Sequence, residues 1–248
     1  MAKDLFSNQA ALYAQYRPVY PVELYDFILQ HITNPQQAWD CATGNGQAAV
    51  ELARYFEKVM ATDISEKQLQ QAIPNDRITY AVSTAEQTPF PDNSFDCITV
   101  AQAYHWFQFE AFGKEVQRIA RPGAIVAIWG YSLIVGEDEA LNTLIQSFYR
   151  DTVGAYWDKE RRYIDEHYTK VPFPYEPLPS KEFRINVQWH RQQLIGYFNT
   201  WSSVQHFIKA HQYNPVDELA TVIANLWPDD SIKSFYFPLF LKLGRVVK

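Results

Sequence analysis

The residues with the clearest chemical potential form a loop, Trp39 to Ala49, together with one aspartate further along the chain. The loop reads Trp-Asp-Cys-Ala-Thr-Gly-Asn-Gly-Gln-Ala-Ala and joins a strand pattern to a helical one. Its two glycines permit a tight turn and a close backbone approach to a nucleotide. Asp63 follows the next strand, where a carboxylate can accept both ribose hydroxyls. The spacing predicts a nucleotide site; a glycine turn and a helix-capping aspartate are the structural alternative.

Three further polar residues could belong to such a site. Arg17 precedes Pro18, which favours an extended backbone, and it could pair with a ligand carboxylate or with a surface acid. Asp40 ends an apolar strand and could hold the glycine loop, bind water at a ligand's amino group, or act as a cap. His105 follows the fourth expected strand; it could orient a substrate, accept its proton, or form a structural wall.

Aromatic residues near these positions could line an apolar pocket, although about half of them are expected in the core instead. The candidates are Tyr104, Trp106, Trp129, Tyr131 and Trp201. No metal site is expected, because His206 and His211 lie off a shared helix face and no cysteine accompanies them.

Strands and helices alternate up to about Trp129, which predicts parallel pairing through right-handed crossovers. Ser65 and Gln68 are typical of a capping box at a helix start. The last of these helices should end at Arg121-Pro122-Gly123. The expected strands are 37–42, 58–62, 78–82, 95–101 and 124–129, and the expected helices are 46–56, 66–72 and 109–120.

After about Trp129, the regular alternation of strands and helices ends. Residues 171–179 are rich in proline and tyrosine and should be irregular. Pro238, inside the last strand, indicates an edge or a bulge. Helices are expected over 139–149, 194–209 and 216–226, and strands over 183–189 and 234–243. The simplest organisation is one domain, with a core of about 30–130 and 183–248 and a cap from 1–25 and about 131–230.

Composition narrows the class of protein. The chain has 248 residues, 47% of them hydrophobic, and a formal net charge of −6. This charge disfavours general nucleic-acid binding, which needs a basic face. Cys41 and Cys97 lie in apolar strand patterns, so a disulfide framework is not expected and a reducing cytoplasm fits best. No signal-peptide core or membrane-spanning stretch is visible, and the oligomeric state stays open.

Four segments, in order, make the chain resemble the class I S-adenosylmethionine-dependent methyltransferases (methyltransferase type 11). The glycine loop is similar to the family's Asp-x-Gly-x-Gly-x-Gly, with Ala42 replacing the first glycine. Residues 83–96 are close to Ala-Glu-x-x-Pro-Phe-x-Asp-x-Ser-Phe-Asp, and residues 118–124 are similar to Arg-x-Leu-x-Pro-Gly-Gly. The last strand resembles the antiparallel seventh strand of this fold. Residues 16–21, 103–107 and 200–202 look like the trans-aconitate methyltransferase subgroup.

The resemblance implies an α/β fold: a Rossmann-like, seven-stranded, mostly parallel sheet with an antiparallel last strand and a helical cap. It also implies S-adenosyl-L-methionine as cofactor, with Ala85 and Glu86 facing the adenine and Gln102 near the amino-acid end. The implied cofactor residues are Arg17, Asp40, Ala42, Gly44, Gly46, Asp63, Ile64, Ala85, Glu86, Ala101 and Gln102.

The expected reaction is methyl transfer to a small molecule, with a carboxylate or a hydroxyl as acceptor. A carboxylate is ionised at neutral pH and needs no base, whereas a hydroxyl needs one, which makes His105 the candidate catalytic residue. An NAD(P)-dependent Rossmann oxidoreductase and a non-catalytic S-adenosylmethionine-binding protein are the alternatives. Ala85-Glu86 ahead of Phe95-Asp96 favours the methyltransferase, because a dehydrogenase has no use for that segment.

Overall fold

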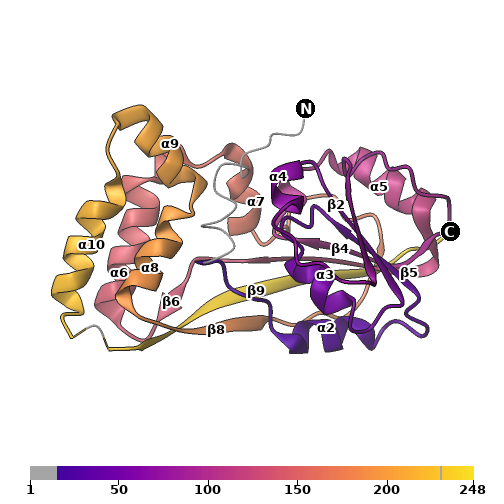
Figure 1. Ribbon diagram of the computed structural model, residues 1–248, viewed down its shortest axis with the longest axis horizontal. Coiled ribbons are helices and arrows are strands. Elements are labelled where there is room, and N and C mark those ends of the chain that lie inside the picture. Colours follow the sequence, from indigo (N-terminus) through magenta and orange to yellow (C-terminus); the bar gives the residue numbers. More distant parts are fainter. Residues whose placement is uncertain (1–15, 230) are drawn as a thin grey trace.

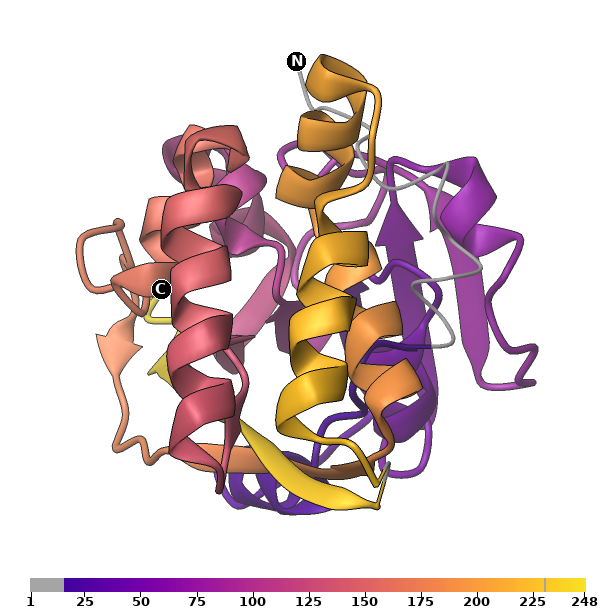
Figure 2. The ribbon, with the colours of Figure 1, turned by 90° about the vertical axis from the view of Figure 1, so that its left-hand side faces the viewer.

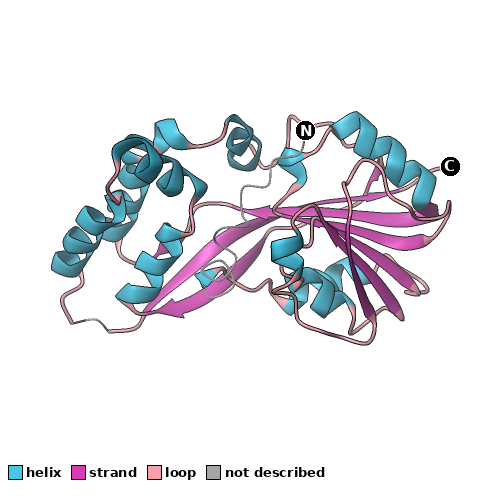
Figure 3. Ribbon diagram, turned by 45° about the horizontal axis from the view of Figure 1, so that its top comes forward, coloured by secondary structure: helices cyan, strands magenta, loops and turns pink. Residues whose placement is uncertain are grey.

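The protein is described by a computed structural model that covers residues 16–229 and 231–248. Figure 1 shows a twisted sheet with helices on both faces at one end and a helical cap at the other. Two long strands run from the sheet into the cap, as Figure 3 shows in magenta. Within these ranges no helix is long and apolar enough to cross a bilayer.

The sheet has nine strands in the described residues, in the order β3-β2-β1-β4-β5-β9-β6, with β7 and β8 also pairing with β9. The five strands from β3 to β5 are parallel, and β9 runs antiparallel to β5. The bounds are β1 Gln37–Cys41, β2 Lys58–Asp63, β3 Ile78–Val82, β4 Phe95–Ala101, β5 Ala120–Tyr131, β6 Val135–Gly136, β7 Glu176–Pro177, β8 Phe183–Trp189 and β9 Lys233–Arg245. The expected fold class is confirmed; the count exceeds seven because the two-residue strands β6 and β7 add to the sheet.

Helices cover the sheet and build the cap. In the cap, α10 packs against both α6 and α8, as Figure 2 shows from that side. The α-helices with described bounds are α2 Val22–Leu29, α3 Gln47–Leu52, α4 Glu66–Leu69, α5 Phe109–Ile119, α6 Glu139–Ser147, α7 Arg162–Asp165, α8 Arg191–Asn199, α9 Ser202–His211 and α10 Pro215–Leu226. A π-helical turn, Phe148–Thr152, continues α6.

The parallel strands are buried on both faces, which explains their nearly continuous apolar runs. In β1, Ala38 packs on the face covered by α2 and α3, whereas its neighbour Trp39 packs on the face covered by α5. The first of these two cores continues into the cap, where it includes Ile145 and Phe198. The cap is therefore joined to the sheet by shared packing as well as by β8 and β9.

The helices α3 and α4 end earlier than expected, at Leu52 and Leu69, and three other elements differ from the expected ones. The predicted helix 194–209 is two helices, because the chain turns at Thr200, whose hydroxyl donates to the Tyr197 carbonyl over 2.6 Å, and Trp201 then takes an extended backbone. The strand β5 begins at Ala120 rather than 124, with a register shift opposite Phe95 and Cys97 that absorbs the Arg-Pro-Gly turn. The irregular segment 171–179 contains the short strand β7.

Pro238 does not lie on a sheet edge. It faces Arg184 of β8 on one side, and its carbonyl accepts the Ser132 amide over 2.9 Å on the other. Tyr131 pairs with Leu239 and Val135 with Tyr236, so three residues on the partner side lie opposite two on β9. This irregularity lies beside Pro238, which has no amide hydrogen to donate to a regular ladder.

Candidate active site

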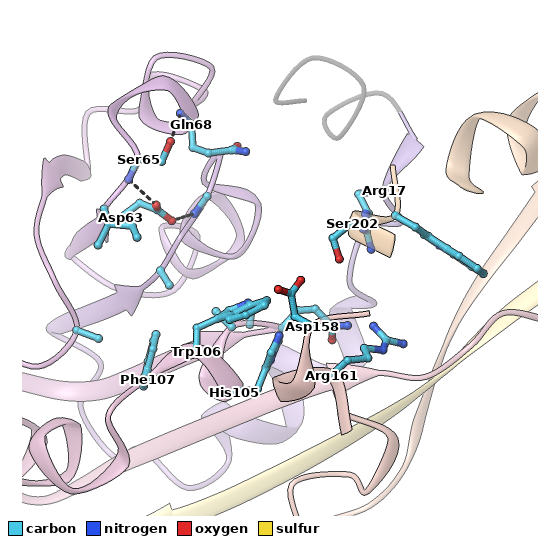
Figure 4. Close-up of a pocket in the computed structure, with 18 of the residues that line it drawn as sticks. Arg17, Asp63, Ser65, Gln68, His105, Trp106, Phe107, Asp158, Arg161 and Ser202 are labelled. Atoms are coloured by element: carbon cyan, nitrogen blue, oxygen red, sulfur yellow. Dashed lines mark hydrogen bonds between the residues drawn. The ribbon is translucent and has the colours of Figure 1, made fainter. Parts of the chain in front are cut away.

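A pocket lies between the carboxyl ends of the parallel strands and the cap (Figure 4). It encloses about 1380 Å³ of empty space, part of it open to solvent. Its sheet side is lined by Ala42, Gly44, Asp63, Ile64, Ser65, Gln68, Ser83, Ala85, Glu86, Ala101, Gln102, Ala103 and Phe107. Its other lining residues are Arg17, His105, Trp106, Leu133, Trp157, Asp158, Arg161, Tyr197, Trp201 and Ser202.

The glycine loop turns through left-handed backbone angles. Gly44 has φ +58° and Gly46 has φ +87°, a region that favours glycine. A Cβ on Gly46 would lie 2.5 Å from the Tyr80 hydroxyl, so this glycine is needed for packing beneath the loop and does not line the pocket. A Cβ on Gly44 would meet nothing within 4 Å, so the backbone there is open to the cavity.

Asp63 links the loop to the end of β2. Its carboxylate accepts the Gly44 amide over 2.8 Å and the Ser65 amide over 2.9 Å. Figure 4 shows the side chain between these two segments at the pocket wall. Ser65 also caps α4 by accepting the Gln68 amide, as the sequence predicted, although α4 is shorter than expected. The predicted pairing of glycine loop and acid is therefore a direct contact.

Asp40 lies beneath the loop, outside the pocket lining. It is fully buried and accepts hydrogen bonds from the hydroxyls of Thr43 (2.5 Å) and Thr99 (2.7 Å). Burial raises its pKa to about 6, against the opposing effect of these two hydrogen bonds. The sequence left three roles open for Asp40: holding the glycine loop, binding water at a ligand's amino group, and capping a helix. This geometry favours the first role.

Arg17 and Gln102 are both tied to Tyr131 at the end of β5. Arg17 donates to the Tyr131 hydroxyl over 2.5 Å and to the Thr200 carbonyl over 3.2 Å, so it connects the sheet to the cap. The Gln102 side-chain amide binds the Tyr131 backbone on both its oxygen and its nitrogen. Both residues line the pocket, and both are held in place by the protein itself.

His105 is buried beside Tyr168, with 2.9 Å between Nδ1 and the tyrosine hydroxyl. Burial, helped by the nearby Arg161 charge, lowers the His105 pKa to about 3. Burial also raises the pKa of Tyr168, so both rings are neutral at physiological pH. A neutral imidazole of such low basicity is a poor proton acceptor.

The predicted substrate aromatics divide between pocket and core. Trp106 and Trp201 line the pocket. Tyr104, Trp129 and Tyr131 lie outside its lining and are buried in the two cores. The sequence around each residue gave no signal that distinguishes an aromatic of the pocket from one of the core. In the described ranges, no cluster of His, Cys, Asp and Glu could hold a metal ion.

The cap contributes pocket residues that the sequence motifs did not identify. Trp157 and Tyr197 add aromatic surface, and Asp158 and Arg161 add opposite charges three residues apart. No sequence motif covers these residues. The one signal that could have identified them as pocket residues is the cluster of aromatic and charged residues around Trp157. Figure 4 shows Asp158 and Arg161 on the side of the pocket opposite Asp63.

The pocket fits S-adenosylmethionine by the chemistry of its lining. Gly44 leaves room for close approach, Asp63 faces the space beside it, and Ile64, Ala85 and Phe107 offer apolar surface for a flat base. The predicted cofactor residues that line the pocket are Arg17, Ala42, Gly44, Asp63, Ile64, Ala85, Glu86, Ala101 and Gln102. Asp40 and Gly46 support the loop from below.

Comparison with known proteins agrees with this geometry. Residues 39–128 match the methyltransferase domain family. A Dictyostelium discoideum protein assigned as a methyltransferase is 32% identical over 98% of this chain and 95% of its own length. A solved structure, assigned as a type II methyltransferase of Anaeromyxobacter dehalogenans, is 33% identical with a TM-score of 0.86, covering 94% of this chain and 99% of its own.

The methyltransferase cfoB of Aspergillus candidus is 29% identical over 79% of this chain and 70% of its own length. The resemblance to trans-aconitate methyltransferases in particular stays a prediction. The nicotinamide alternative finds no support among these relatives. The fold, the glycine loop with its aspartate, and these full-length similarities establish that the chain belongs to the class I S-adenosylmethionine-dependent methyltransferases.

Proposed function

We propose that the protein methylates an oxygen of a small molecule held between Trp106 and the cap. The observation that carries this proposal is the continuity of one pocket from Asp63 to Arg161. Its lining runs from Gly44 and Asp63 at the sheet end to Trp157 and Arg161 at the cap end. The space suits a cofactor at the sheet end and an acceptor at the cap end.

The bound cofactor supplies an electrophilic methyl group, so the protein needs no covalent nucleophile. Its own residues align the two ligands and exclude water. We propose that Gly44, Asp63 and Glu86 hold the nucleoside and that Arg17 meets the carboxylate at its amino-acid end. Trp106, Trp157 and Trp201 would cover the acceptor.

The His105 geometry favours an acceptor that is already ionised. A neutral Tyr168 hydroxyl can donate to Nδ1, which leaves the imidazole proton on Nε2. We propose that His105 acts as a hydrogen-bond donor to the acceptor or its surroundings, rather than as a base. A carboxylate then suits the site better than a hydroxyl, since it needs no proton acceptor.

A hydroxyl acceptor is the second candidate, and one observation supports it. The Asp158 Oδ2 atom is buried without a hydrogen-bond partner among the described residues. A carboxylate in that state can accept a proton from a hydroxyl. The two candidates predict different pH dependence, because only the hydroxyl route requires an ionisable base in the protein.

We also propose that the chain is one methyltransferase domain that works in the cytoplasm, without nucleic-acid partners. The net charge of −6 supports the last point, and the buried, unpaired Cys41 and Cys97 fit a reducing compartment.

Calorimetry and a transfer assay test the proposed function together. We expect binding of S-adenosylmethionine and S-adenosylhomocysteine, no comparable binding of NAD(P)H, and formation of S-adenosylhomocysteine when small carboxylic acids are added. Preferential binding of the nicotinamide nucleotide would contradict the cofactor assignment. Cofactor binding with no transfer to any carboxylic acid or phenol in a broad panel would favour a non-catalytic binding protein instead.

A further inference from the structure

The Arg161 guanidinium is fixed in one orientation at the cap end of the pocket. Its Nε donates to the Tyr149 hydroxyl over 3.1 Å, and that hydroxyl donates in turn to Asp165 over 2.8 Å. The guanidinium also lies over the Trp157 ring, with 4.8 Å to the ring centroid. Three neighbours therefore determine which way its terminal nitrogens face.

The terminal nitrogens of Arg161 make no hydrogen bond within residues 16–229 and 231–248. The side chain is 18% exposed and lines the pocket. The Asp165 carboxylate lies 3.5 Å from Nε, and its side chain is half exposed. These nitrogens are not among the buried atoms that lack a partner, so they are open to the pocket, where a ligand anion can meet them.

Asp158 does not neutralise this edge. No ion pair joins it to Arg161 in the described part of the chain, and its Oδ2 lies 3.9 Å from Nδ1 of the His206 ring. Arg17, the other cation on this side, is bound to Tyr131 and Thr200, and the proposed function assigns it to the cofactor's own carboxylate. The acceptor end thus offers one ready-made anion partner, Arg161, and one carboxylate that would repel an anion placed near it.

The surroundings of Arg161 are aromatic. The Trp157 and Trp201 rings lie 5.4 Å apart, and Tyr197 packs against Trp201 at 5.8 Å. Such walls accept an apolar body, while a guanidinium fork matches the two oxygens of a carboxylate. Together they describe a ligand with an apolar skeleton and one carboxylate.

We propose that Arg161 binds a carboxylate of the methyl acceptor through its two terminal nitrogens, which makes small carboxylic acids with an apolar skeleton the substrate class. This inference rests on the proposed function, because it assigns the cap end of the pocket to the acceptor. Arg161 is then a specificity-determining residue that no sequence motif marks. The Asp158 carboxylate would repel a negatively charged group of the acceptor placed beside it.

Three probes with one ring and different charges test the inference: benzoate, benzamide and benzylamine, titrated into the protein saturated with S-adenosylhomocysteine. We expect benzoate to bind about tenfold or more tightly than benzamide, and benzylamine to bind least. Arg161→Gln should remove the preference for benzoate, and Arg161→Lys should keep part of it, because lysine retains the charge without the fork. Asp158→Asn should leave benzoate binding intact or strengthen it.

Arg162→Gln is the matched control, since Arg162 is exposed and contacts Tyr163 outside the pocket. S-adenosylhomocysteine affinity, measured for every variant, reports on folding. Tighter binding of benzylamine, equal binding of benzoate and benzamide, no benzoate binding, or an unchanged preference in Arg161→Gln would each overturn the inference. Failure of the unmodified protein to bind S-adenosylhomocysteine would instead refute the proposed function.

Discussion

The Gly44 amide donates to the Asp63 carboxylate over 2.8 Å, so the loop after β1 is bonded to the residue that ends β2. Two motifs that are separate in the sequence therefore form one structural unit. Asp63 shapes the loop through this bond and its bond to Ser65, and its oxygens retain lone pairs that can face a ligand. Loop geometry and ligand binding should depend on the same side chain.

Replacement of Asp63 by alanine tests this dual role. We expect Asp63→Ala to weaken S-adenosylhomocysteine binding by about 1–3 kcal/mol, the cost of leaving ligand hydroxyls without acceptors. Isothermal titration calorimetry measures the loss, and the exposed Asp76→Ala serves as control. Unchanged affinity in a folded Asp63→Ala protein would show that the nucleoside lies elsewhere.

Replacement of the two loop glycines by alanine should affect different properties: Gly46→Ala the stability, and Gly44→Ala the cofactor affinity. Gly46→Ala combines a left-handed backbone with a Cβ 2.5 Å from the Tyr80 hydroxyl, so it should mainly lower the unfolding free energy, by more than the roughly 1–2 kcal/mol of backbone strain. Gly44→Ala has space for its Cβ and should lose cofactor affinity with a smaller stability loss. Urea unfolding and calorimetry on both variants separate the effects; equal stability losses would contradict the account.

Asp40 should make stability depend on pH. Its pKa is about 6 in the folded chain and 3.8 as the ordinary value, so the folded state holds more protons between roughly pH 4 and 6, and stability falls as pH rises through that window. The full effect is on the order of 3 kcal/mol. Relative to the unmodified protein, Asp40→Asn should gain stability from pH 4 to 7. Parallel stability curves for the two proteins would refute this.

His105 should stay neutral throughout the physiological range. With a pKa near 3, its ring carbon signal in NMR should not titrate between about pH 5 and 8. Since the unfolded pKa is near 6.5, the folded state binds fewer protons below that pH, and stability should fall as pH drops toward 3. His105→Gln should reduce that acid sensitivity. A His105 titration centred near 6.5 would restore its candidacy as a base.

The strands of the sheet could be predicted because the sequence patterns that indicate them are local. Alternation of apolar runs with turn residues located β3, β4 and β8 to the residue. The loop and Asp63 could be paired because successive parallel strands bring their carboxyl ends together. The break between α8 and α9 was missed, since it occurs at Thr200 and Trp201 without a glycine or proline to mark it.

The residues that line the acceptor end of the pocket could not be predicted from the sequence, for a physical reason. Arg161 faces the cavity because Tyr149, Asp165 and Trp157 hold it there, and those contacts form only after the cap has folded. Tyr104 and Trp106 are two residues apart in one 3₁₀ turn, yet one is fully buried in the core and the other lines the pocket. No periodicity distinguishes them.

A crystal structure with S-adenosylhomocysteine is the most direct measurement of the central claim. The account predicts the ribose hydroxyls on Asp63, the base beside Ala85 and Phe107, and the sulfur facing the space between Trp106 and Arg161. A ligand bound outside this pocket, or one whose sulfur faces away from the cap, would contradict it.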